Sequence, residues 1–163
     1  MTPFKSLPGI CALLLAGGAQ AGVFGTMSGS PAPPNAERKY DAATLKRVDL
    51  KSCVVDAYSI DTADALFEMQ RPKVEEERAE LQKLREASRG KPTSESAAAE
   101  TQLRAKAQMF NAKVAALNSQ VAYAQETRER FSRLCKGRRY YFDDLSELRG
   151  ELPAEIAAIL PAK

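Results

Sequence analysis

A run of basic and aromatic residues shortly after Cys135 is the first candidate for a binding surface: Arg138, Arg139, Tyr140, Tyr141 and Phe142. Guanidinium groups beside aromatic rings bind anionic lipid, peptidoglycan or the acidic face of a protein through charge and cation–π contacts. The alternative is local packing. Segment 126–139 holds six basic and two acidic residues, and segment 143–155 holds five acidic and one basic. A turn at Gly137 would pair these segments and bury Tyr140 or Phe142. We keep the run as the candidate partner-binding site, with both interpretations open.

Asp143, Asp144 and Glu147 form a cluster of carboxylates whose chemistry would be metal binding or acid–base catalysis. Adjacent aspartates at a helix start are explained more simply, because they cap backbone N–H groups and interact favourably with the helix dipole. We therefore predict no metal site and no cofactor.

The composition excludes several kinds of function. The 163 residues include no His, which removes His-dependent triads and His-ligated zinc. No CxxC pair is present, and neither are the motifs of hydrolases, nucleotide-binding loops or calcium-binding loops. The formal charge of +3 is too small for a general nucleic-acid binder. We predict that the chain is not an enzyme and does not bind nucleic acid.

The first 21 residues have the pattern of a secretory signal peptide. Lys5 supplies the positive start, residues 10–16 a short apolar stretch, and Ala19-Gln20-Ala21 a small-x-small cleavage site. The apolar stretch is much shorter than the ~20 residues that cross a bilayer. We expect a mature chain that begins at Gly22, lies in the periplasm and has no integral membrane span. Residues 22–39 are rich in Gly, Ser and Pro and are predicted to be a flexible leader.

Removal of the signal leaves two cysteines, Cys53 and Cys135. An even pair of cysteines in an exported chain most often forms a disulfide. The alternative, two buried free thiols, is less common in an oxidising compartment. We predict a Cys53–Cys135 disulfide.

Apolar residues recur every seven positions in two separate parts of the chain, as in helices that pack like coiled coils. The first series is Cys53, Ile60, Phe67, Val74 and Leu81, and the second is Leu103, Phe110, Leu117, Ala124 and Phe131. Between them, Gly90 and Pro92 are typical of a helix end, and Thr93 or Ser94 of a helix start. The pattern predicts an antiparallel helical hairpin with helices over about 41–89 and 94–136. Pro72 is expected to kink the first helix.

The cysteines give an independent test of the hairpin register. Residue numbers that face each other in an antiparallel hairpin have a constant sum, which for the cysteine pair is 188 and places the turn centre at 94. The same sum pairs Phe67 with Val121 and Val74 with Val114. The disulfide and the heptads therefore predict the same register.

The apolar face of the first helix is wide up to Met69 and narrow beyond it. The wide part needs a third element, which the apolar residues of segment 143–160 are able to supply. We therefore predict one all-α domain over 40–163, with a three-helix base and a two-helix arm of about 30 Å. An arm this thin is expected to be mobile, covered by a partner or packed against copies of itself.

No residue motif assigns the chain to a family. In general shape alone, the expected hairpin resembles Skp-type periplasmic chaperones, although the chain lacks the flanking strand runs of their oligomeric body, and minor pilin subunits of type IV secretion systems. Three functions are consistent with such a shape. The first is an envelope assembly factor or secretion-apparatus component that binds a protein partner. The second is a Skp-like holdase chaperone. The third is an inhibitor or immunity protein that blocks a periplasmic enzyme with the Gly90–Ser96 tip.

Overall fold

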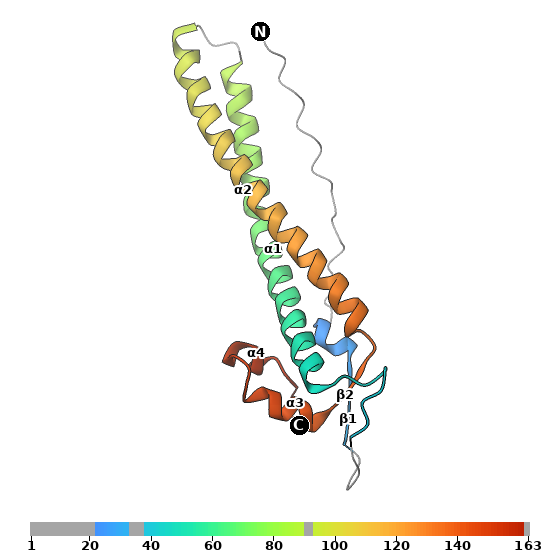
Figure 1. Ribbon diagram of the computed structural model, residues 1–163. Coiled ribbons are helices and arrows are strands. Elements are labelled where there is room, and N and C mark those ends of the chain that lie inside the picture. The colour runs from blue at the N-terminus through green and yellow to red at the C-terminus, as the bar shows by residue number, and fades with distance from the viewer. Residues whose placement is uncertain (1–21, 33–37, 90–92, 162–163) are drawn as a thin grey trace.

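Two long antiparallel helices dominate the fold (Figure 1). The computed structural model describes residues 22–32, 38–89 and 93–161, and for residues 93–96 it describes the backbone alone. Helix α1 spans Arg47–Ser88 and helix α2 spans Thr93–Leu134. The predicted all-α hairpin is confirmed. The predicted signal peptide and the tip residues 90–92 lie outside the described residues.

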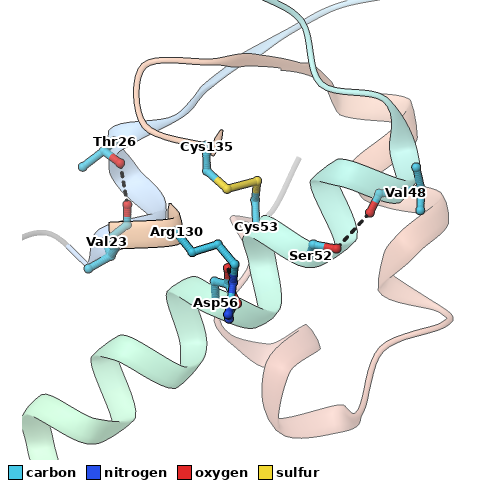
Figure 2. Close-up of a disulfide and its surroundings, with 8 residues drawn as sticks. All are labelled: Val23, Thr26, Val48, Ser52, Cys53, Asp56, Arg130 and Cys135. Atoms are coloured by element: carbon cyan, nitrogen blue, oxygen red, sulfur yellow. Dashed lines mark hydrogen bonds and ion pairs between the residues drawn. A yellow bond between two sulfur atoms is a disulfide. The ribbon is translucent and has the colours of Figure 1, made fainter. Parts of the chain in front are cut away.

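The predicted register is confirmed by covalent and ionic contacts between the helices. Cys53 and Cys135 form a disulfide with a Cα–Cα distance of 5.7 Å (Figure 2). Ion pairs join Asp56 to Arg130, Asp64 to Arg128 and Glu77 to Lys113. Each ion pair lies within four positions of the register that the cysteines define. Helix α1 continues without interruption through Pro72.

The base of the hairpin holds the hydrophobic core. Two short helices after α2, α3 (Phe142–Arg149) and α4 (Ala154–Ala158), pack on α1 and supply the predicted third element. The core joins them to both long helices through the following buried side chains: Leu50, Cys53, Val54, Ala57, Ile60, Phe131, Cys135, Tyr140, Leu145, Leu148, Leu152, Ile156 and Leu160.

The arm has no core of this kind. Among the described side chains, none is buried over residues 61–88 of α1 or 97–123 of α2. The seam residues Phe67, Val74 and Leu81 are half-buried there, because two helices cover each other on one side only. At 1.5 Å per residue the arm extends about 40 Å beyond the base, which is longer than the sequence predicted.

The predicted flexible leader is wrong for residues 22–32. This segment forms a 3-10 turn, η1 (Val23–Thr26), and a short strand, β1 (Ser28–Ser30), and buries Met27. Strand β1 pairs in parallel with β2 (Arg139–Tyr141), with Ser28 opposite Arg139. The Val23 N–H donates to Asp61 Oδ1 of α1 at 3.1 Å. A segment without apolar period still docks here, because the backbone of β2 offers free hydrogen-bonding groups. Residues 33–37 of the predicted leader lie outside the described residues.

Helix α1 begins at Arg47 and not near residue 41. The preceding residues lie along the backbone of β2: the Leu45 N–H donates to the Arg139 carbonyl, and the Arg139 N–H donates to the Ala43 carbonyl. Asp41 accepts the Ala43 N–H at 2.9 Å through its side chain. These hydrogen bonds favour an extended segment over a further helical turn. No described helix contains an apolar stretch long enough to span a membrane.

Candidate protein-binding surfaces

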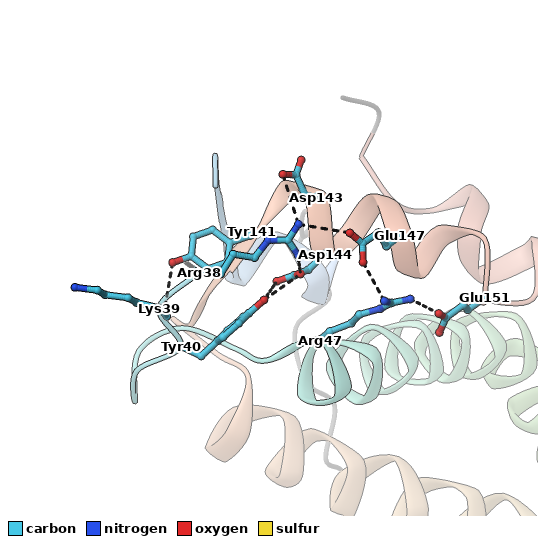
Figure 3. Close-up of polar contacts among 9 residues, drawn as sticks. All are labelled: Arg38, Lys39, Tyr40, Arg47, Tyr141, Asp143, Asp144, Glu147 and Glu151. Atoms are coloured by element: carbon cyan, nitrogen blue, oxygen red, sulfur yellow. Dashed lines mark hydrogen bonds and ion pairs between the residues drawn. The ribbon is translucent and has the colours of Figure 1, made fainter. Parts of the chain in front are cut away.

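The aromatic residues of the predicted binding segment are used largely for packing. Tyr140 is 3% exposed, and its ring lies 5.8 Å from that of Phe24 and 6.1 Å from that of Phe142, between ring centres. This burial raises the pKa of the Tyr140 hydroxyl. The Tyr141 hydroxyl donates to the Lys39 carbonyl at 3.0 Å (Figure 3). The predicted turn at Gly137, which has a φ of 74°, and the predicted burial of Tyr140 are confirmed.

The remaining residues of this segment leave a smaller exposed surface. Phe142 is 41% exposed on its outer side. Its inner side lies against Gly29, where a Cβ atom would approach the ring to 2.2 Å. Arg138 is half-buried, and exposed Arg139 lies 3.7 Å from Asp41. A partner at this segment would therefore meet the arginines and one edge of Phe142.

The acidic residues of α3 and the turn after it form an ionic cluster with cations that lie far from them in the sequence. Asp144, only 1% exposed, accepts hydrogen bonds from Arg38 and from the Tyr40 hydroxyl (Figure 3). Arg38 also lies 3.8 Å from Asp143 and 3.5 Å from Glu147. The pKa of Arg38 is raised, first by its hydrogen bond with Tyr40, so the guanidinium stays charged.

The predicted pairing of segment 126–139 with segment 143–155 is therefore wrong. Arg47 and Lys51 of α1, together with Arg38, take the places expected for the basic residues that precede Gly137. The reason is that α3 packs on α1, so its carboxylates face the start of that helix. Within the described part of the chain, no cluster of three or more His, Cys, Asp or Glu residues is arranged to hold a metal ion.

A second surface, which no motif in the sequence predicts, lies on the base half of α1. Uncharged residues follow one another there every three or four positions, outside the seam with α2: Val48, Ser52, Val55, Ser59, Thr62, Leu66 and Met69. All but half-buried Ser59 are exposed, Val48 by 69% and Met69 by 55%. The hydroxyls of Ser52 and Ser59 donate to the carbonyls of Val48 and Val55, the first of which Figure 2 shows. The two serines therefore need no other hydrogen-bond acceptor.

The outer half of α2 carries a series with the same spacing: Ala98, Gln102, Ala105, Met109, Ala112, Ala116, Ser119 and Tyr123. Every one of these side chains is exposed, Met109 by 75% and Tyr123 by 62%. The Ser119 hydroxyl donates to the Ala115 carbonyl. We call the two series together the uncharged stripe.

An ion pair shows that both halves of the stripe lie on the same side of the hairpin. Arg130 follows Tyr123 by one heptad and so continues the line of the α2 series. Its guanidinium binds both carboxylate oxygens of Asp56, at 2.9 and 2.6 Å, next to Val55 in the α1 series (Figure 2). The stripe therefore runs along α1 at the base and along α2 in the arm, over about 60 Å.

Charged residues mark the ends of each series. The α1 line continues outward through Lys73, Glu76, Glu80 and Lys83, and the α2 line continues toward the base through Glu126, Arg130 and Arg133. The sequence signal for the stripe is therefore the recurrence of uncharged residues every three or four positions. Strongly apolar heptads do not reveal the stripe, because Ser, Thr and Ala make up much of it.

The chain matches no protein-family model, no curated protein and no solved structure.

Proposed function

We propose that this protein is an exported, non-enzymatic interaction protein that binds a helical segment of protein along the uncharged stripe, as an envelope assembly factor or a component of a secretion apparatus. The observation that carries the proposal is the stripe itself. It consists of exposed uncharged side chains at helical spacing on a hairpin whose described arm side chains are at most half-buried. Large apolar side chains that are exposed in one line, such as those of Val48, Met69 and Met109, are typical of surfaces that bind other macromolecules.

The form of the stripe favours a helix as the bound element. Positions that recur every three or four residues present one narrow face of a helix, which matches the seam of a second helix. Loops and strands have no such period along 60 Å of surface. Large side chains at Val55, Leu66 and Met109 alternate with Ser and Ala, so a bound helix finds both knobs and holes.

Export is supported by the signal-like start and by the cysteine pair. A disulfide between distant parts of the chain persists in an oxidising compartment and is rare in the cytosol. A non-enzymatic role is supported by the lack of His and by the ionic cluster at the base. There, Asp144 is occupied by Arg38 and Tyr40 and is buried away from any substrate.

Site-specific photocrosslinking in intact cells tests the stripe as a docking surface. A benzophenone amino acid at Met69 or Met109 is expected to form protein adducts. The same group at exposed Ala79 of α1 or Asn111 of α2, which lie off the stripe, is expected to form none. The Met69 adduct should also disappear when Met109 is replaced by Lys, because both halves of the stripe hold the same partner. Adducts of equal yield at the control positions, or none at the stripe, would contradict the proposal.

A Skp-like holdase role is the second candidate, favoured by the exposed methionines. Met69 and Met109 are 55% and 75% exposed, and flexible thioether side chains adapt to unrelated apolar partners. A holdase would suppress aggregation of unrelated unfolded proteins, and Met109→Lys would remove that activity. An assembly component would show no such suppression. The inhibitor hypothesis relied on the tip, whose residues 90–92 lie outside the described part of the chain.

A further inference from the structure

The two halves of the uncharged stripe have the same spacing, residue for residue. Adding fifty to each position from Val48 to Met69 gives a position of the α2 series, from Ala98 to Ser119. The next step joins Lys73 to Tyr123. Two helices whose seams share one spacing interlock along their whole length when they pack side by side in parallel.

The sizes of the side chains are complementary in this alignment. Leu66 meets Ala116, Met69 meets Ser119, and Ser59 meets Met109, so a large residue faces a small one in each of these three pairs. Val48 and Val55 meet Ala98 and Ala105 in the same way. Alternation of large and small residues across a seam fills space without voids or clashes.

Within one chain this contact is impossible. Helices α1 and α2 are antiparallel, and the two halves of the stripe lie at opposite ends of the hairpin. We infer that a second copy of this chain occupies the stripe, which names the partner for the docking surface proposed above and rests on that proposal. The α1 half of each copy packs in parallel with the α2 half of the other.

The arrangement closes as a two-fold dimer. The two hairpins lie antiparallel, and the symmetry axis passes near Met69 and Ser119, which are level with each other in the hairpin register. Each α1–α2 contact is then repeated once by symmetry, as in an isologous interface. Fifteen stripe residues from each copy, with their neighbours, approach the roughly 20–30 residues a side of a stable interface.

The charges beside the contact between the two copies permit this pairing. Along its flanks, Asp56 faces Thr101, Ala63 faces Gln108 and Tyr58 faces Lys113. Lys51 and Lys106 are the like charges that come together there. Lys51 already lies 3.5 Å from Glu151 of its own chain, which offsets its charge. At the end of the seam, the Lys73 ammonium reaches the Tyr123 ring, a cation–π contact.

Intermolecular disulfide trapping tests the dimer in the exported protein with its own disulfide intact. A mixture of Leu66→Cys and Ala116→Cys chains is expected to form a covalent heterodimer under mild oxidation. A mixture of Leu66→Cys and Ala105→Cys chains is the control. It should not do so, because Ala105 lies three turns away from the Leu66 contact. Equal trapping in the two mixtures, or none in the first, would overturn the arrangement.

Molar mass in solution gives the second measurement. By light scattering after size exclusion, the unmodified chain is expected at twice the monomer mass. Met109→Lys is expected at the monomer mass with unchanged helical circular dichroism, and Asn111→Lys at the dimer mass. A monomeric unmodified chain would overturn the inference. If that chain still gave stripe-specific adducts with a different protein in cells, the docking function would stand and only the identity of its partner would change.

Discussion

At the scale of single residues, burial of phenol groups makes the base sensitive to alkaline pH. Tyr140 lies in the core, and Tyr40 donates to Asp144 beside Arg38. Burial is the main cause that raises the pKa of both hydroxyls above the ordinary value, with the hydrogen bond from Arg38 opposing it at Tyr40. The folded state therefore holds these two protons more tightly than the unfolded state does.

The sign of the pH effect follows from that difference. The contribution of both phenols to stability is complete below the unfolded-state pKa of about 10 and is lost as the pH rises through the folded-state values. When the pH is raised, tyrosinate absorbance of the native protein is expected to show a late component, which appears at higher pH than the absorbance of an ordinary tyrosine. Tyr40→Phe and Tyr140→Phe should each remove one tyrosine from that component. In denaturant the late component should be absent, and its persistence there would show that burial is not its cause.

At the scale of elements, the sequence predicted the parts that depend on helical period. The heptads from Cys53 to Leu81 and from Leu103 to Phe131 locate both long helices and their register. This is because a helix that packs against one other helix needs apolar residues along one face. The short segments depend on backbone pairing, which leaves little trace in residue types. For this reason the residue types predict a flexible leader where the strand Ser28–Ser30 lies, and a helix where residues 41–46 are extended.

The same distinction explains what was missed at the candidate sites. Tyr140 and Phe142 were identified as aromatic residues that either bind or pack, and only their neighbours in space decide which. Arg38 is separated from Asp144 by more than a hundred residues, so no local pattern connects them. In the sequence, the uncharged stripe is visible only as a series of positions, three or four residues apart, that carry no charged side chain.

The disulfide is the element-scale feature whose removal has the most direct consequence. It joins the two helices at the base and closes a long loop that contains the whole arm. Replacing Cys53 and Cys135 together by Ala is expected to lower the free energy of unfolding by about 2–5 kcal/mol, mainly because the unfolded chain gains freedom. Thermal unfolding with and without reductant measures this. Reductant should shift the melting temperature of the native protein and leave that of the double variant unchanged.

At the scale of the whole molecule, the base and the arm differ in what holds them together. The base has a contiguous core from four helices and the docked N-terminal segment, whereas the described side chains of the arm are at most half-buried. Local opening should therefore cost less free energy in the arm than in the base. A second copy on the stripe would cover part of the arm with the base of its neighbour, so association and stability of the arm are coupled.

Hydrogen exchange measured by mass spectrometry separates these contributions. In the monomeric Met109→Lys variant, peptides from 61–89 and 97–123 are expected to exchange much faster than base peptides. In the dimer the arm peptides should slow toward the rates of the base.

Val54→Ala, at a fully buried site, should cost about 2–3 kcal/mol of unfolding free energy and speed exchange in base and arm alike, because the base carries the global stability. Val74→Ala, at a half-buried site of the arm, should speed exchange in the arm alone. Equal rates for base and arm in the monomer would mean that the hairpin opens as one unit and that its seam is stronger than its burial implies.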